Sequence, residues 1–163
     1  MAVVWFCPDC WSEVSEADAT CPACGSVLKG GRERNFVQKL IAALRHPEPE
    51  TAVRAAHTLG GLGAKEAVPA LIETLTRSDD PYLLDAVAGS LGELEAAEAI
   101  PALRSVLRSS YLVARIAAAK ALGRLGTPEA LAVLEEARQD QSESVRQAVE
   151  EQLAERRNLP PSS

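Results

Sequence analysis

The sequence predicts an all-α solenoid of about eight helices, preceded by a small metal-bound ribbon. Two observations carry this prediction. A Leu-Gly phrase recurs at Leu59, Leu91 and Leu122, at intervals of 32 and 31 residues. In addition, all four cysteines of the 163-residue chain lie within its first 24 residues. Sequence periods of about 20–50 residues are typical of stacked helical repeats, and closely spaced cysteine pairs are typical of metal sites.

The cysteines form two Cys-x2-Cys pairs, separated by ten residues. A two-residue spacer lets both sulfurs of a pair approach one ion, while nearby backbone amides point toward the thiolates. We therefore expect one closed tetrahedral site formed by Cys7, Cys10, Cys21 and Cys24. A short strand over 3–6 is expected to enter the first pair. The strings CPDC and CPACG resemble the knuckles of zinc ribbons and of rubredoxin-type proteins.

Three states are open for these thiols. Structural zinc is the preferred prediction, because a module of about 30 residues has too small a core to fold unaided. Iron in a rubredoxin-like redox site is the alternative cofactor. The third state is a disulfide or a thioredoxin-like active site. However, no βαβ pattern surrounds either pair, and nothing indicates an oxidising compartment.

The paired glycines at Gly30 and Gly31 predict a boundary between the module and the repeats. We divide the chain into a zinc-ribbon-like module, a linker, a repeat region and a disordered tail, at 1–29, 30–33, 34–157 and 158–163. Apolar residues at helical spacing predict helices at 34–45, 50–60, 65–77, 81–92, 97–109, 112–123, 128–139 and 142–157.

The predicted helices alternate between two patterns. The first, third, fifth and seventh are B helices, two of which carry a proline near the first turn, Pro69 or Pro101. The others are A helices, most of which end in the Leu-Gly phrase, where glycine is available for a left-handed cap. The incomplete first copy leaves the first B helix without a preceding A helix. We therefore expect the cysteine module to fold back as an N-terminal cap or to lie beside this helix.

The strings AVRAAHTLGGLGAKEAVPALIETL and ARIAAAKALGRLGTPEALAVL resemble HEAT repeats of the short, phycobilisome-lyase-like class. The resemblance covers 34–157 and implies a right-handed α-solenoid, with A helices on the convex side and B helices on the concave side. Members of this class mostly bind other proteins, although some are enzymes. Deoxyhypusine hydroxylases use His-Glu pairs as iron ligands, and no such dipeptide occurs here. We expect His46 and His57 to be surface or packing residues.

Composition and charge exclude several function classes. The chain has 17 basic and 23 acidic residues and a net charge of −6, whereas nucleic-acid binding needs a basic surface. No apolar run approaches the roughly 18 residues of a membrane helix. The start lacks the basic segment of a secretory signal, so we expect a cytoplasmic protein. No catalytic motif stands out.

These features predict a non-enzymatic scaffold or adaptor that binds protein partners within a larger complex. The alternative is an accessory subunit or enzyme of redox or lyase type, with iron in the cysteine site or a bilin-lyase-like repeat function. The candidate partner-binding residues are Trp5, Trp11, Lys39, Arg45, Arg77, Arg104 and Arg108.

Two interpretations are open for the tryptophans among these candidates, and two for the arginines. The tryptophans form the core of the module or serve as anchors for a partner. The arginines of the B helices form an ordinary solvated face, or a partial basic stripe that binds an acidic peptide and runs toward Glu135 and Glu136. By contrast, Arg115 and Arg146 are expected to tie adjacent repeats together through Asp80 or Asp140.

Overall fold

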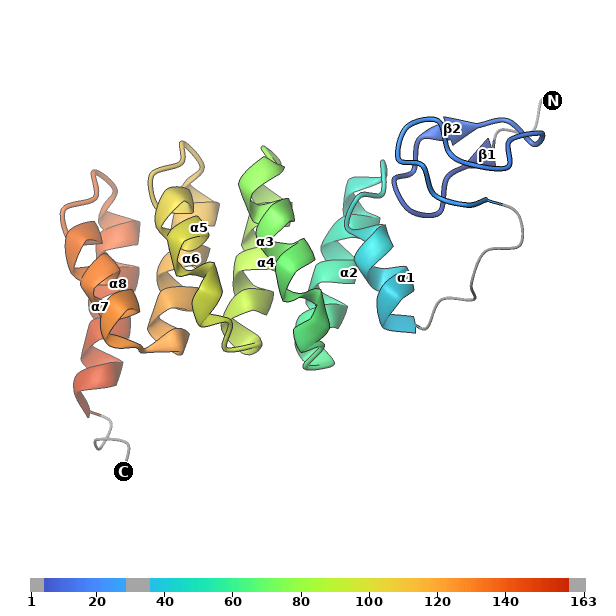
Figure 1. Cartoon of the computed structure of the whole chain (residues 1–163). Coiled ribbons are helices and arrows are strands. Elements are labelled where there is room, and N and C mark those ends of the chain that lie inside the picture. Colours follow the sequence, from blue (N-terminus) through green and yellow to red (C-terminus); the bar gives the residue numbers. More distant parts are fainter. Residues whose placement is uncertain (1–4, 29–35, 159–163) are drawn as a thin grey trace.

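The computed structural model of the chain describes residues 5–28 and 36–158. Within these residues, a two-stranded sheet is followed by eight α-helices that stack side by side (Figure 1). The elements are β1 (Trp5–Phe6), β2 (Glu13–Val14), α1 (Phe36–Ala43), α2 (Pro49–Gly61), α3 (Val68–Arg77), α4 (Pro81–Glu93), α5 (Ile100–Val106), α6 (Leu112–Leu125), α7 (Pro128–Ala137) and α8 (Glu143–Asn158). The predicted all-α solenoid with a small N-terminal cysteine module is confirmed.

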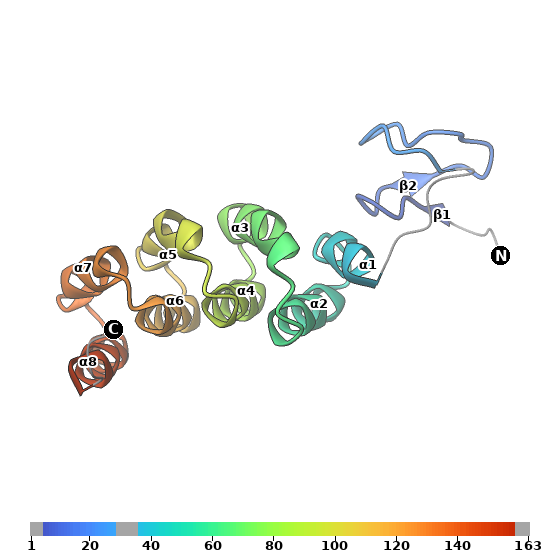
Figure 2. The ribbon, with the colours of Figure 1, turned by 60° about the horizontal axis from the view of Figure 1, so that its bottom comes forward.

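The helices form two layers, which Figure 2 shows nearly end on. The B helices α1, α3, α5 and α7 lie in one layer, and the A helices α2, α4, α6 and α8 lie in the other. Leucines one repeat apart fill the space between the layers. The fully buried ones are Leu59, Leu91 and Leu122 on A helices and Leu71, Leu103 and Leu134 on B helices. Each repeat thus contributes equivalent side chains to one continuous core.

Two B helices begin three residues later than the sequence pattern predicts. Each is preceded by a single 3-10 turn, at Lys65–Ala67 and at Ala97–Ala99. The α-helices α3 and α5 then start, with Pro69 or Pro101 as their second residue. Proline fits this position because the first helical N–H groups have no partner inside the helix.

The glycine that directly follows the first leucine of each phrase is not the helix cap. Gly60, Gly92 and Gly123 lie inside helices, at the contact with the next A helix. A Cβ atom on Gly60 would lie 2.9 Å from the Cα of Ser90, and one on Gly92 would lie 3.1 Å from the Cα of Ala121. These glycines therefore let the backbones of neighbouring A helices approach closely.

The left-handed residues of the repeats lie three positions further along the chain, and the predicted glycine cap is confirmed at the end of α6. They are Gly63, Glu95 and Gly126, with φ values of 65°, 54° and 58°. Gly126 ends α6, and its N–H donates to the carbonyl of Leu122. At the equivalent position of the middle repeat, Glu95 adopts the same conformation in spite of its side chain.

Replacing Gly60 with alanine is expected to destabilise the solenoid by about 1–3 kcal/mol, because the new methyl group would press on the backbone of α4. Gly89 provides the matched control, since it is also helical but a Cβ atom added there would have no other atom within 4 Å. Gly89→Ala is expected to stabilise α4 by about 0.5–1 kcal/mol. Urea denaturation of both variants measures the difference, and equal effects would contradict this account.

The described residues contain no helix that is both long and apolar enough to cross a membrane. Helix α8 continues to Asn158, the first residue of the predicted tail. The predicted linker at 30–33 and the remainder of the tail at 159–163 lie outside the described residues.

Candidate metal centre

The two cysteine pairs have the same backbone geometry. In the first pair, the N–H of Trp11 donates to the carbonyl of Cys7 over 2.9 Å. In the second, the N–H of Gly25 donates to the carbonyl of Cys21 over 2.8 Å. Strands β1 and β2 pair in antiparallel register, with Trp5 opposite Val14, and lead into and away from the first pair. The chain thus forms two equivalent turns that face each other.

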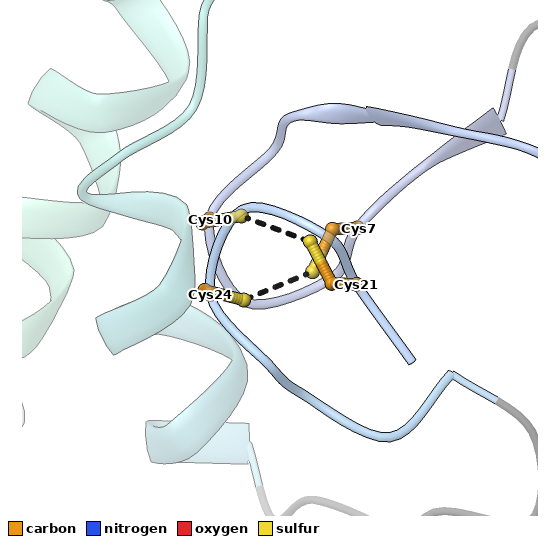
Figure 3. Close-up of side chains that lie close together, drawn as sticks. All are labelled: Cys7, Cys10, Cys21 and Cys24. Atoms are coloured by element: carbon orange, nitrogen blue, oxygen red, sulfur yellow. Dashed lines mark hydrogen bonds between the residues drawn. The ribbon is translucent and has the colours of Figure 1, made fainter. Parts of the chain in front are cut away.

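These turns bring all four sulfurs together (Figure 3). The Sγ atoms lie within 4.8 Å of one another. The distances from Cys7 to Cys24 and from Cys10 to Cys21 are both 3.6 Å. A tetrahedral ion with bonds of about 2.3 Å to sulfur would separate its ligands by about 3.8 Å. A disulfide bond is about 2.05 Å long, and all four cysteines are free. The donor set therefore fits a thiolate-bound ion.

The surroundings of Cys7, Cys10 and Cys24 change how readily these thiols ionise. Burial raises the pKa of the Cys7 thiol to about 11, although the N–H of Asp9 donates to its sulfur over 3.4 Å. The side chain of Ser12, 3.3 Å from the Cys10 sulfur, lowers the pKa of Cys10 to about 6. Ser26 has the same effect on the exposed Cys24, whose pKa is also lowered. One thiolate in each pair is thus favoured before a metal binds.

Ser12 and Ser26 were not among the residues predicted from the sequence. Each stands two positions after the second cysteine of its pair, so both pairs have the form Cys-Pro-x-Cys-x-Ser. This repeated string was the signal that would have identified them. Their hydroxyls lie beside the sulfurs of Cys10 and Cys24, at 3.3 and 3.2 Å.

Metal affinity is expected to fall more steeply with acidity below about pH 6. Each proton that the metal displaces weakens binding by about tenfold per pH unit. Because the pKa of Cys7 is about 11, metal binding displaces a proton from Cys7 throughout the neutral range. Because the pKa of Cys10 is about 6, metal binding displaces a proton from Cys10 only below about pH 6. Competition for zinc with a chromophoric chelator, repeated above and below about pH 6, measures how the affinity changes with pH.

A variant of Ser12 provides the control for this pH dependence. Ser12→Ala removes the hydroxyl, which is the largest cause of the lowered pKa of Cys10, so the break in slope should move to higher pH. Ser15→Ala changes an exposed serine of the same module and should leave the break in place. A slope that stays constant in the wild-type protein would contradict the assignment.

Trp11, one of the candidate partner-binding residues, contacts the solenoid of its own chain. Its indole N–H donates to the carbonyl of Ala42 near the end of α1, over 2.8 Å. Its ring meets that of His46 edge to face, with centroids 4.2 Å apart. The module thus lies against α1, as expected for a cap (Figures 1 and 2). Trp5 and Phe6 each remain 49% exposed.

The arginines of the B helices do not form a free basic stripe. Arg45 on the α1–α2 loop and Arg77 at the end of α3 both contact Glu73, at 2.7 and 2.5 Å. The hydrogen bond and charge of Arg45, followed by those of Arg77, lower the pKa of Glu73. Lys39 is exposed on α1 and has no ion pair within the described residues.

Two repeats further on, a glutamate again contacts two arginines, here both from the preceding B-helix segment. Arg104 on α5 contacts Glu136 on α7 at 2.6 Å, and Arg108 approaches the same carboxylate at 3.8 Å. The partners Arg104 and Glu136 are 32 residues apart and lie on B helices of neighbouring repeats. The face formed by the B helices therefore carries arginines paired with glutamates.

The expected tie between repeats is present at Arg115. This side chain is buried, and its Nε lies 3.1 Å from a carboxylate oxygen of Asp140, on the loop between α7 and α8. Arg146 donates to the backbone carbonyl of Asp140 over 2.7 Å. Asp80, the other expected partner, instead caps α4, where it accepts from the N–H of Tyr82.

Comparison with known proteins identifies the class to which this fold belongs. The family model for HEAT repeats matches residues 37–115 and 75–154. Together these matches cover most of the solenoid, and the chain belongs to the HEAT-repeat family. A search of curated proteins finds no match.

Two of the solved structures that are similar to the chain show what the fold is used for elsewhere. Human deoxyhypusine hydroxylase in complex with glycerol has 28% sequence identity and a TM-score of 0.67, over 79% of this chain and 46% of that chain. The complex of CpcE and CpcF of phycocyanin lyase from Nostoc sp. PCC7120 has 27% sequence identity and a TM-score of 0.58, over 69% of this chain and 45% of that chain. This chain thus spans less than half the length of each matched chain.

Proposed function

We propose that the protein is a non-enzymatic scaffold that binds protein partners, and that its four cysteines hold a structural zinc ion. The observation that carries the zinc assignment is the closed set of four sulfurs. Structural zinc sites have four protein ligands, whereas catalytic ones keep a position open for water or substrate. Within 5–28 and 36–158, no other cluster of three or more histidine, cysteine or acidic residues is close enough to hold a metal.

The proposed partner surface is the hollow between the module and the B helices α1 and α3, with a volume of about 970 Å³. Val27 and Leu28 of the module line one side, and Ile41 and Ala70 line the other. The exposed Lys39 lies at this hollow and offers a cation to an acidic group of the partner. Trp5, half exposed on β1, is a further candidate contact.

Affinity capture from a lysate of the source cells, followed by mass spectrometry, tests the scaffold role. Lys39→Glu reverses the charge at the hollow, and Lys120→Glu makes the same change at an exposed position on α6. We expect Lys39→Glu, but not Lys120→Glu, to lose partners that the wild-type protein retains at moderate salt. Identical recovery with both variants would refute the assignment of this surface.

The alternative function is an accessory subunit or enzyme of redox or lyase type. The likeness to a hydroxylase and to a lyase complex favours it, and four thiolates also suit iron. Elemental analysis and the visible absorption spectrum of the purified protein distinguish the two proposals. Colourless protein with one zinc per chain supports the structural site, and coloured, iron-loaded protein supports the redox alternative. We also propose a cytoplasmic location, because reducing compartments preserve free thiols.

A further inference from the structure

Trp11 adopts a backbone conformation that a bulky residue rarely takes. Its φ is 60°, and that of Gly25, the equivalent residue of the second pair, is 75°. Both residues donate an N–H to the carbonyl of the first cysteine of their pair. The turn thus demands a left-handed residue at this position, which glycine supplies without strain and tryptophan does not. A compensating interaction of the Trp11 side chain is therefore expected.

The contacts with the solenoid provide that compensation. The indole N–H of Trp11 donates to the carbonyl of Ala42 near the end of α1, and this carbonyl also accepts the N–H of Arg45 over 3.2 Å. The ring also packs on His46, whose Nδ1 accepts the N–H of Glu48 over 2.9 Å. Glu48 is the N-cap residue of α2. One side chain of the module thus contacts the corner that joins the first two helices.

The position of this side chain depends on the cysteine turn. Trp11 follows Cys10 directly, and its own N–H closes the turn onto Cys7. An ion held by the four sulfurs would fix both ends of this turn, and so fix the direction in which the indole points. The strands of the module have only two residues each, too few to maintain the turn alone.

We propose that Trp11 is a positioning residue that couples metal occupancy to the docking of the module on the α1–α2 corner. This inference rests on the proposed metal centre. It deepens the proposed function, because the hollow between Val27 of the module and Ile41 of α1 exists only while the module is docked. The partner surface is then present in the metal-loaded protein and lost from the metal-free one.

The two tryptophans allow a direct spectroscopic test in the full chain. Trp5→Phe leaves Trp11 as the sole tryptophan, so its emission reports docking. Adding a strong chelator to the zinc-loaded variant should shift the emission to longer wavelength. It should also raise amide hydrogen exchange over 36–48 by about tenfold or more. Restoring zinc should reverse both changes.

Variants of Trp11 separate docking from metal binding. Trp11→Gly matches the residue of the second pair, so it should retain one zinc per chain. Even when loaded, it should show the fast exchange over 36–48 that chelation produces in the wild-type protein. Trp11→Phe keeps a ring but loses the N–H donor to Ala42, and should give an intermediate rate. Phe6→Ala, at a half-exposed position of the same module, should leave the exchange at the loaded wild-type rate.

The possible outcomes distinguish a failure of this proposal from a failure of the proposed metal centre on which it rests. Wild-type protein that binds no metal would overturn both. Zinc-loaded protein whose Trp11 emission and 36–48 exchange do not respond to zinc removal would overturn the coupling alone. So would loaded Trp11→Gly with wild-type exchange over 36–48.

Discussion

Replacing Cys7 with serine is expected to abolish stoichiometric metal binding and to unfold residues 5–28, while the distant repeats remain helical. A structural zinc site contributes roughly 10–16 kcal/mol of apparent binding free energy, and a serine hydroxyl does not replace a thiolate. Cys7 is fully buried between the two turns, so its loss also opens the centre of the module. The repeats from α3 to α8 are supported by their own neighbours and should stay folded.

Elemental analysis measures the first effect, and hydrogen exchange by segment measures the second. Ala23→Ser is the matched control, since it adds a serine at an exposed position within the second cysteine pair and keeps all four thiols. It should bind zinc like the wild-type protein. If Cys7→Ser retained one tightly bound ion per chain, the four-sulfur site would be wrong.

Replacing Asp140 with asparagine is expected to lower the free energy of unfolding by about 3 kcal/mol. Asp140 is the carboxylate partner of the buried Arg115, and their side chains are only 12% and 5% exposed. Asparagine keeps the size of the side chain and an oxygen that accepts from the N–H of Ser142. The variant therefore removes mainly the negative charge and leaves the Arg115 cation buried without compensation.

Thermal and urea denaturation measure this effect, and the loss corresponds to a decrease in melting temperature of roughly 10 °C. Asp79→Asn is the matched control, because Asp79 is exposed on the equivalent loop between α3 and α4. It should change the stability by less than about 0.5 kcal/mol. Equal effects of the two variants would show that the buried pair does not tie the last two repeats together.

Some features of the fold followed from local sequence patterns. Apolar residues at helical spacing identified eight helices, with ends that differ from the observed ones by a few residues. The recurring leucines predicted the stack, because equivalent residues such as Leu59 and Leu91 must enter one core. The spacing of the cysteines predicted that Cys7, Cys10, Cys21 and Cys24 would lie together, which the structure reproduces.

The role of the recurring glycines was not apparent from the same patterns. A glycine near a helix end indicates a cap, which is a property of one helix. The structure instead places Gly60 against Ser90 of the next A helix, 30 residues away in sequence. The cap conformation falls on Gly63 and, in the next repeat, on Glu95. Only the distance between two helices distinguishes these roles.

The sequence by itself determined the stack of helix pairs and the four-cysteine set, because both depend on spacing within short segments of the chain. Only the tertiary structure decided the partners of Trp11, Arg45 and Arg104, which lie 28 to 32 residues away in sequence. Such contacts depend on how one repeat, or the module, is seated on its neighbour. That arrangement pairs Arg45 and Arg104 with glutamates, and it places Trp11 in contact with the solenoid.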